Sequence, residues 1–215
     1  NKTNLVISGC KVSGNLNENL VLKAYNLLSN DFKLPQLTIY LHKQIPLGAG
    51  LGGGSADAAF MLCMLNSNYK LGLSTEELKK YALKLGADCS FFIDNKPSFA
   101  SGKGEILNTI KLSLKGYYLV LIKPDISVET AMAYSLCTPQ KPAVSLLDIA
   151  EQPPEEWKGC MKNDFEDPIF KIYPAIAEIK NKLYQKGAVY ASMSGSGSSV
   201  FGIFNQQPEL NNCFS

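Results

Sequence analysis

Histidine and tryptophan are almost missing from this sequence, which has one of each among 215 residues. Six cysteines are present, but no two are spaced as Cys-x-x-Cys, and His42 is the only histidine. These absences exclude a zinc site of ordinary spacing, and we predict no metal-ligating residue in the chain. Because a chain of this length can bury a core without disulfides, we expect the cysteines to be reduced and buried.

The sequence also lacks a strong charge of either sign and a long apolar run. Its formal net charge is +2 and no basic run occurs, which argues against a nucleic-acid or membrane surface built on bulk charge. No apolar stretch approaches the roughly 20 residues that span a bilayer, and Asn1-Lys2-Thr3 does not begin a signal peptide. We therefore expect a cytoplasmic protein without nucleic-acid or membrane partners; no signal indicates an oligomeric state.

Glycine is concentrated in one stretch, Pro46-Leu47-Gly48-Ala49-Gly50-Leu51-Gly52-Gly53-Gly54-Ser55-Ala56-Asp57. An apolar run at residues 58–65 follows and is long enough for a helix of about three turns. A glycine-rich loop that opens into a helix gathers free N–H groups at the positive end of the helix dipole, so it predicts a phosphate site. The stretch is neither a Walker loop nor a dinucleotide-binding fingerprint.

The alternative for this stretch is a flexible loop that Ser55 or Asp57 caps at the start of the helix. Against it, the following helix is apolar on every side, so we expect it to be buried in a core rather than to follow a linker.

Other patterns predict the organisation of the chain. Strands are expected at residues 5–9, 37–41 and 117–122, and Phe91 begins a further aromatic strand. Ser74 and Glu77 form a capping box, and Ser127 and Asn163 are expected to cap two later helices. Because a new apolar strand begins near Tyr117, we expect two domains, 1–114 and 115–215.

At the glycine-rich stretch the chain resembles the GHMP kinases (galactokinase, homoserine kinase, mevalonate kinase and relatives), whose second motif is Pro-x-x-x-Gly-Leu-Gly-Ser/Gly-Ser-Ser/Ala. The triple glycine before Ser55, and Gly86-Ala87-Asp88 with Phe91-Phe92, are most similar to the branch that acts on a cytidine-diphosphate-linked methylerythritol. The loop Ser194-Gly195-Ser196-Gly197 resembles the third family motif. The resemblance implies an α+β fold in two domains, each a mostly antiparallel sheet with helices packed on one side, with the active site between the domains.

The resemblance also implies roles for individual residues. ATP, with Mg²⁺, would be held by the residues from Pro46 to Ala56, and Asn19 would border the adenine. Asp88 would take the proton from the 2-hydroxyl of the substrate, although from the residues alone a turn-capping role is favoured; Ser90 stands where proline is usual. The loop from Ser194 to Gly197 would close the site beside the substrate phosphates. Tyr134 either stacks on the cytosine or is a core tyrosine.

Two motifs of this branch are not in the chain, an Asn/Ala-Lys-Leu/Ile-Asn-Leu strand and a Gly-Tyr-His segment. Because that lysine pairs with the catalytic aspartate, we expect the chain as printed to be a poor kinase. Two further interpretations therefore stay open, another small-molecule kinase of the same family and a nucleotide-binding relative without catalysis.

Overall fold

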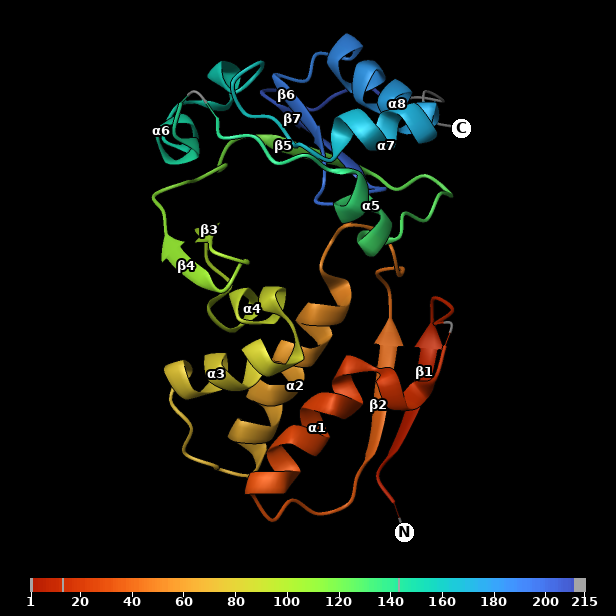
Figure 1. The fold of residues 1–215 in the computed structure, drawn as a ribbon, viewed down its shortest axis with the longest axis vertical. Helices are drawn as coiled ribbons and strands as arrows, with labels where there is room; N and C mark the ends of the chain where they lie inside the picture. Colours follow the sequence, from red (N-terminus) through yellow and green to blue (C-terminus); the bar gives the residue numbers. More distant parts are fainter. Residues whose placement is uncertain (1, 13, 143, 211–215) are drawn as a thin grey trace. The chain divides into compact units, whose positions relative to one another are not determined.

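The structure, a computed structural model, describes residues 2–12, 14–142 and 144–210, and these form two compact units (Figure 1). The first unit comprises the described residues up to Leu47 together with Gly52–Ile110. The second comprises Gly48–Leu51 together with the described residues from Lys111 onward. Four residues of the glycine-rich stretch therefore belong to the second unit, although the helix that follows them belongs to the first.

The first unit begins with two parallel strands, β1 (Asn4–Gly9) and β2 (Thr38–Lys43). Parallel strands need a crossover, and this one contains the short 3₁₀ helix η1 (Leu16–Glu18) and the helix α1 (Leu20–Asp31). The unit continues through α2 (Gly53–Asn68), α3 (Thr75–Leu85), η2 (Ala87–Cys89), α4 (Phe91–Asp94) and the antiparallel hairpin of β3 (Ser98–Ser101) and β4 (Ile106–Thr109).

The core of the first unit forms where α1 packs against α2 and α3, around the fully buried Leu28, Leu62 and Ala82. The predicted capping box at Ser74 is confirmed. The expectation that α2 is buried on every side is wrong, because Phe60 and Met64 are 54% and 46% exposed. These two residues are four apart and therefore share one face of the helix, opposite the face that packs on its neighbours.

The second unit is built on an antiparallel sheet of β5 (Tyr118–Ile122), β7 (Val200–Phe204) and β6 (Tyr190–Met193), in that order across the sheet. Helix α8 (Pro174–Gln185) packs on β6 and β7, and α7 (Glu166–Ile172) packs on α8. The other face of the sheet contacts Trp157 and the short helix α6 (Leu146–Ala150). With α5 (Thr130–Leu136) and η3 (Pro154–Glu156), these elements confirm the α+β class.

Two local predictions are wrong. Phe91 begins helix α4 and not a strand, because the preceding Ser90 is itself in the right-handed helical conformation and the chain continues to turn. Ser127 does not cap α5, whose cap position is Glu129. Glu129 is in the extended conformation, and Val128 before it lies in the core of the second unit at 1% exposure.

The expectation that the cysteines are buried holds for only some of them. All five that the structure describes are free, but Cys160 is exposed and only Cys89 is fully buried; Cys213 lies outside the described residues. Within the described part of the chain, no helix combines the length and the apolar character that crossing a membrane requires.

Candidate active site

The second unit brings the glycine-rich stretch and the loop between β6 and β7 into close contact. Ser194 Oγ donates a hydrogen bond to the Gly50 carbonyl at 2.7 Å, and the Ser199 amide donates to the Ala49 carbonyl at 3.1 Å. Gly50 has φ +72°, and a Cβ there would lie 2.2 Å from the Ser194 carbonyl oxygen. Only glycine fits both the conformation and the space, so the small residues of the two motifs allow their backbones to pack directly.

Helix α2 begins without a side-chain cap. Its N-cap residue is Gly52, in the left-handed conformation, and no side chain accepts a hydrogen bond from the first turn. The alternative in which Ser55 or Asp57 caps the helix is therefore wrong. The N–H groups of a first helical turn have no acceptor within the helix, so this end is electrostatically suited to an anion.

Asp57 instead pairs with Lys43, the last residue of β2. Lys43 Nζ lies 2.5 Å from Asp57 Oδ2, and the lysine side chain is only 4% exposed. A Cβ at Gly53 would lie 3.1 Å from the same nitrogen and 2.8 Å from Ile45 Cγ2. A buried ammonium group therefore lies beside Gly53, the first residue of α2. No sequence pattern indicated this ion pair, because Lys43 and Asp57 are 14 residues apart and share no motif.

A pocket of about 220 Å³ opens beside this ion pair, within the first unit. Asn19 lines it, and its Oδ1 also accepts a hydrogen bond from the Val21 amide as the N-cap of α1. The full lining is Val12, Gly14, Asn15, Leu16, Glu18, Asn19, Leu20, Lys43, Leu47, Gly54 and Asp57. Four of these come from the predicted set or its immediate motif, namely Asn19, Leu47, Gly54 and Asp57.

Asp88 lies in η2 and its side chain is exposed. Its neighbour Cys89 is fully buried in the core of the first unit. Burial raises the pKa of the Cys89 thiol, and the nearby Ser55 hydroxyl offsets part of that rise. Ser90 stands where the resembled family usually has proline, and its hydroxyl donates to the Ala87 carbonyl at 3.1 Å, which closes the turn. The turn thus holds the Asp88 carboxylate at the surface, next to a residue that packs on α2.

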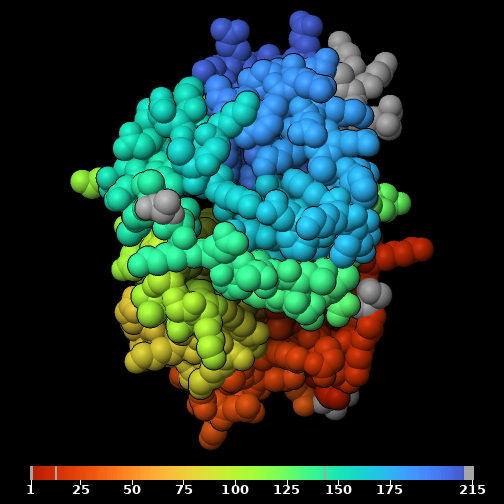
Figure 2. Space-filling model, turned by 45° about the horizontal axis from the view of Figure 1, so that its top comes forward, coloured from red at the N-terminus to blue at the C-terminus, as the bar shows by residue number. Residues whose placement is uncertain are grey.

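Tyr134 is 66% exposed, so its interpretation as a core residue is wrong. Its ring and that of Phe165 form a T-shaped pair, with ring centroids 4.9 Å apart and an interplanar angle of 76°. In the space-filling view, the green surface of α5 adjoins the cyan-to-blue surface of α7 (Figure 2). This contact holds the Tyr134 side chain in place while most of it stays open to solvent and accessible to a ligand.

Family comparisons agree with these motifs over most of the chain. The model described as GHMP kinases N terminal domain matches residues 19–102, and the model described as GHMP kinases C terminal matches residues 145–214.

Curated relatives are similar over nearly the whole chain. The 4-diphosphocytidyl-2-C-methyl-D-erythritol kinase of Bacteroides fragilis is 57% identical over 203 residues, which are 94% of this chain and 74% of the relative. Proteins of the same name from Bacteroides thetaiotaomicron and Solidesulfovibrio magneticus are 53% and 40% identical, over 94% and 88% of this chain and 74% and 68% of theirs.

Solved structures share the fold. A crystal structure of 4-(cytidine 5'-diphospho)-2C-methyl-D-erythritol kinase matches with a TM-score of 0.71 and 32% identity, over 92% of this chain and 74% of that one. Homoserine kinase from Cytophaga hutchinsonii matches with a TM-score of 0.68 over 96% of this chain and 74% of that one. Its 17% identity makes it a likeness of fold alone.

Proposed function

This chain belongs to the GHMP kinases, and from that premise we propose that it transfers the γ-phosphate of ATP to the 2-hydroxyl of 4-diphosphocytidyl-2-C-methyl-D-erythritol, a step of non-mevalonate isoprenoid precursor synthesis. The observation that carries the proposal is the high identity with curated kinases of that name. The triple glycine and the Gly-Ala-Asp motif, both typical of that branch, support it.

The pocket beside Lys43 and Asp57 would receive the nucleoside of ATP, with Asn19 on its border. The glycine-rich stretch would hold the phosphates through its backbone N–H groups. Gly53 leaves room for a phosphate there, because a side chain at this position would occupy the space next to the Lys43 ammonium group. Lys43 would add a fixed positive charge, and Asp57 would keep that ammonium group in place.

Mg²⁺ would enter with ATP rather than occupy a site made by the protein. Among residues 2–12, 14–142 and 144–210, no three His, Cys, Asp or Glu side chains are grouped so that they could hold a metal ion. Magnesium in kinases is bound largely by the substrate phosphates and waters, with one or two carboxylates, so this arrangement fits it. When bound, it would neutralise charge on the transferred phosphoryl group.

Asp88 would act as the general base for the transfer. Its carboxylate would orient the acceptor hydroxyl and take its proton as the hydroxyl oxygen bonds to the γ-phosphorus and the bond to the bridging oxygen breaks, releasing ADP. Tyr134 would stack on the cytosine of the acceptor through its exposed ring. The loop from Ser194 to Gly197 would close on the phosphates beside the glycine-rich stretch.

A substrate panel tests the proposal. The protein is given ATP, magnesium and one acceptor at a time (the cytidyl methylerythritol, mevalonate, homoserine or galactose), and release of ADP is followed. Of the four acceptors, we expect the cytidyl acceptor to give the fastest release of ADP and a new phosphomonoester signal by ³¹P NMR, with slow turnover overall because the chain as printed lacks the lysine motif. Turnover with another acceptor alone would favour a different kinase, and ATP binding without turnover of any acceptor would favour a non-catalytic relative.

A further inference from the structure

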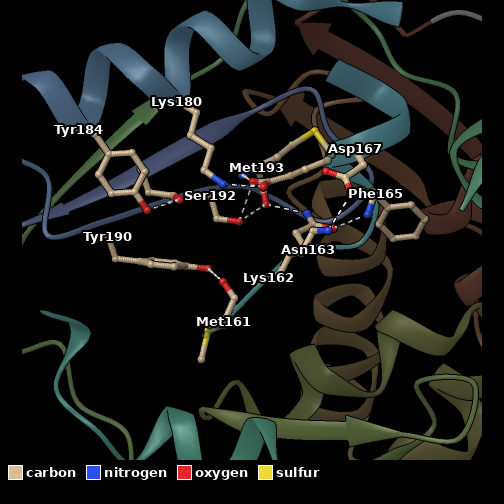
Figure 3. A network of polar contacts seen from close by, with 12 residues as sticks. Met161, Lys162, Asn163, Phe165, Asp167, Lys180, Tyr184, Tyr190, Ser192 and Met193 are labelled. Carbon is tan, nitrogen blue, oxygen red and sulfur yellow. Dashed lines mark hydrogen bonds and ion pairs between the residues drawn. The ribbon is translucent and has the colours of Figure 1, made fainter. Parts of the chain in front are cut away.

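One short segment of the second unit, residues 163–166, holds the backbone where β6 ends (Figure 3). Asn163 Nδ2 donates to the Met193 carbonyl at 2.9 Å and to the Gly195 carbonyl at 2.8 Å. Its Oδ1 accepts from the Phe165 amide at 3.0 Å. One donor of the amide group is therefore used on the last residue of β6 and the other on the loop that follows, and only its acceptor serves the turn before α7.

Glu166, the first residue of α7, also holds the backbone at the end of β6. It is 4% exposed, and its Oε1 accepts from the Met193 amide at 2.8 Å and from Ser192 Oγ at 3.1 Å. Its Oε2 lies 2.5 Å from Lys180 Nζ on α8. A buried carboxylate is costly unless it is paired and hydrogen-bonded, and these partners meet that requirement (Figure 3).

The N–H and the C=O of Met193 are thus both held by side chains, by Glu166 and by Asn163 respectively. Helix capping, the role that the sequence predicted for Asn163, is therefore wrong. The N-cap residue of α7 is Phe165, which provides no side-chain cap, whereas the two bonds that Asn163 donates reach across 30 and 32 residues.

We infer that Asn163 and Glu166 are positioning residues, which hold the Ser194–Gly197 loop in the conformation that packs on Gly50. The held backbone continues directly into Ser194, whose hydroxyl donates to the Gly50 carbonyl and whose own carbonyl accepts from the Gly197 amide at 2.9 Å. The inference rests on the proposed function only in assigning the glycine-rich stretch to ATP phosphates. Without the two side chains, the loop loses its fixed start and the stretch loses its support.

The variant N163D separates this role from capping. Aspartate has the same shape and keeps the oxygen that accepts from Phe165, but it cannot donate to the Met193 and Gly195 carbonyls. We expect amide hydrogen exchange in residues 194–197 to become about 30-fold faster, as the loss of two hydrogen bonds of ordinary net strength implies. Exchange within α7 should stay close to its original rate, because residue 163 keeps the oxygen that accepts from the Phe165 amide. The matched control is N181D, which makes the same change at an exposed position on α8.

Nucleotide affinity supplies the readout that a merely structural role would not change. We expect N163D to weaken ATP binding about tenfold in a calorimetric titration, with N181D unchanged. E166Q is the second variant: it keeps an acceptor for the Met193 amide, loses the pairing with Lys180, and should change both readouts in the same direction.

Unchanged exchange at residues 194–197 in N163D and E166Q would overturn the inferred contact. Faster exchange with unchanged ATP affinity would overturn the positioning role. If N163D does not fold, the same criteria apply to E166Q alone. Failure of the original protein to bind ATP would instead overturn the proposed function, and the exchange comparison would still decide whether the two side chains hold the loop.

Discussion

Replacement of Gly50 by alanine should destabilise the second unit far more than the same change at another glycine with positive φ. A Cβ at Gly50 would lie 2.2 Å from the Ser194 carbonyl oxygen and 2.7 Å from that of Gly197. Both atoms belong to the backbone, so no side-chain rotation can relieve the overlap. The β6–β7 loop would have to move away from the glycine-rich stretch.

Three costs contribute to the expected loss of stability. A left-handed conformation costs alanine about 1 kcal/mol. Displacement of the loop removes the hydrogen bond from Ser194 to Gly50, worth about 1 kcal/mol. Overpacking against two carbonyl groups adds about 1–3 kcal/mol. The control is Gly159, in the same unit, where φ is +84° and no atom lies within 4 Å of the Cβ position. Only the first cost applies there, so G50A should lose about 2–4 kcal/mol more than G159A.

The single tryptophan makes the measurement local. Trp157 is 4% exposed and packs against Tyr190 in the second unit, so its fluorescence reports the unfolding of that unit. For a domain of this size, 1 kcal/mol corresponds to a shift of about 2–6 °C in the midpoint, so G50A should unfold roughly 5–20 °C below G159A. Equal midpoints for the two variants would refute the argument that Gly50 is required for close backbone approach.

Three further predictions concern chemistry, recognition and pH. In an enzyme that also carries the lysine motif, D88N should lower kcat by about 10²–10⁴ and leave ATP affinity unchanged, because the amide cannot accept the acceptor proton; near-normal kcat with a lower unfolding midpoint would make Asp88 a turn cap. Y134A should raise KM for the cytidyl acceptor by about 10- to 100-fold without changing KM for ATP, whereas Y134F keeps the ring and serves as control; equal KM values in all three proteins would exclude stacking. Burial raises the pKa of Tyr190 to about 12, so its stabilising contribution is complete below pH 10 and is lost as the pH rises towards 12. The stability of Y190F should therefore fall less than that of the original protein between these pH values in urea titrations, and parallel curves would contradict this.

Local patterns predicted most of the elements correctly. Alternating apolar residues placed β2, short apolar runs placed β1 and β5, and the Ser74 and Glu77 pair placed the start of α3. These signals involve residues within a few positions of one another, which a sequence displays directly. The glycine-rich stretch was predicted equally well. Five glycines within seven residues indicate either that another backbone or a ligand approaches closely or that the backbone has positive φ.

Partnerships across the chain could not be predicted in the same way. Lys43 forms an ion pair with Asp57 on α2. Glu166 forms an ion pair with Lys180 on α8 and accepts a hydrogen bond from the Met193 amide at the end of β6. Each of these contacts depends on how helices and strands pack, which periodicity does not specify. Asn163 was noticed, but its position before a helix favoured a capping role, and only the structure shows that both of its donors are used elsewhere.

The start of α2 shows why a strong local rule failed at the proposed phosphate site. Serine or aspartate at the cap position would stabilise the helix by about 1 kcal/mol, and both residues are available nearby at Ser55 and Asp57. A capping oxygen, however, would consume the N–H groups that a phosphate needs, and an aspartate there would also repel it. Gly52 leaves those groups free, and Asp57, the fifth residue of α2, holds the Lys43 ammonium group instead. The helix therefore gives up stability at its N-terminus, and the proposed transfer of a charged phosphoryl group accounts for that loss where folding alone does not.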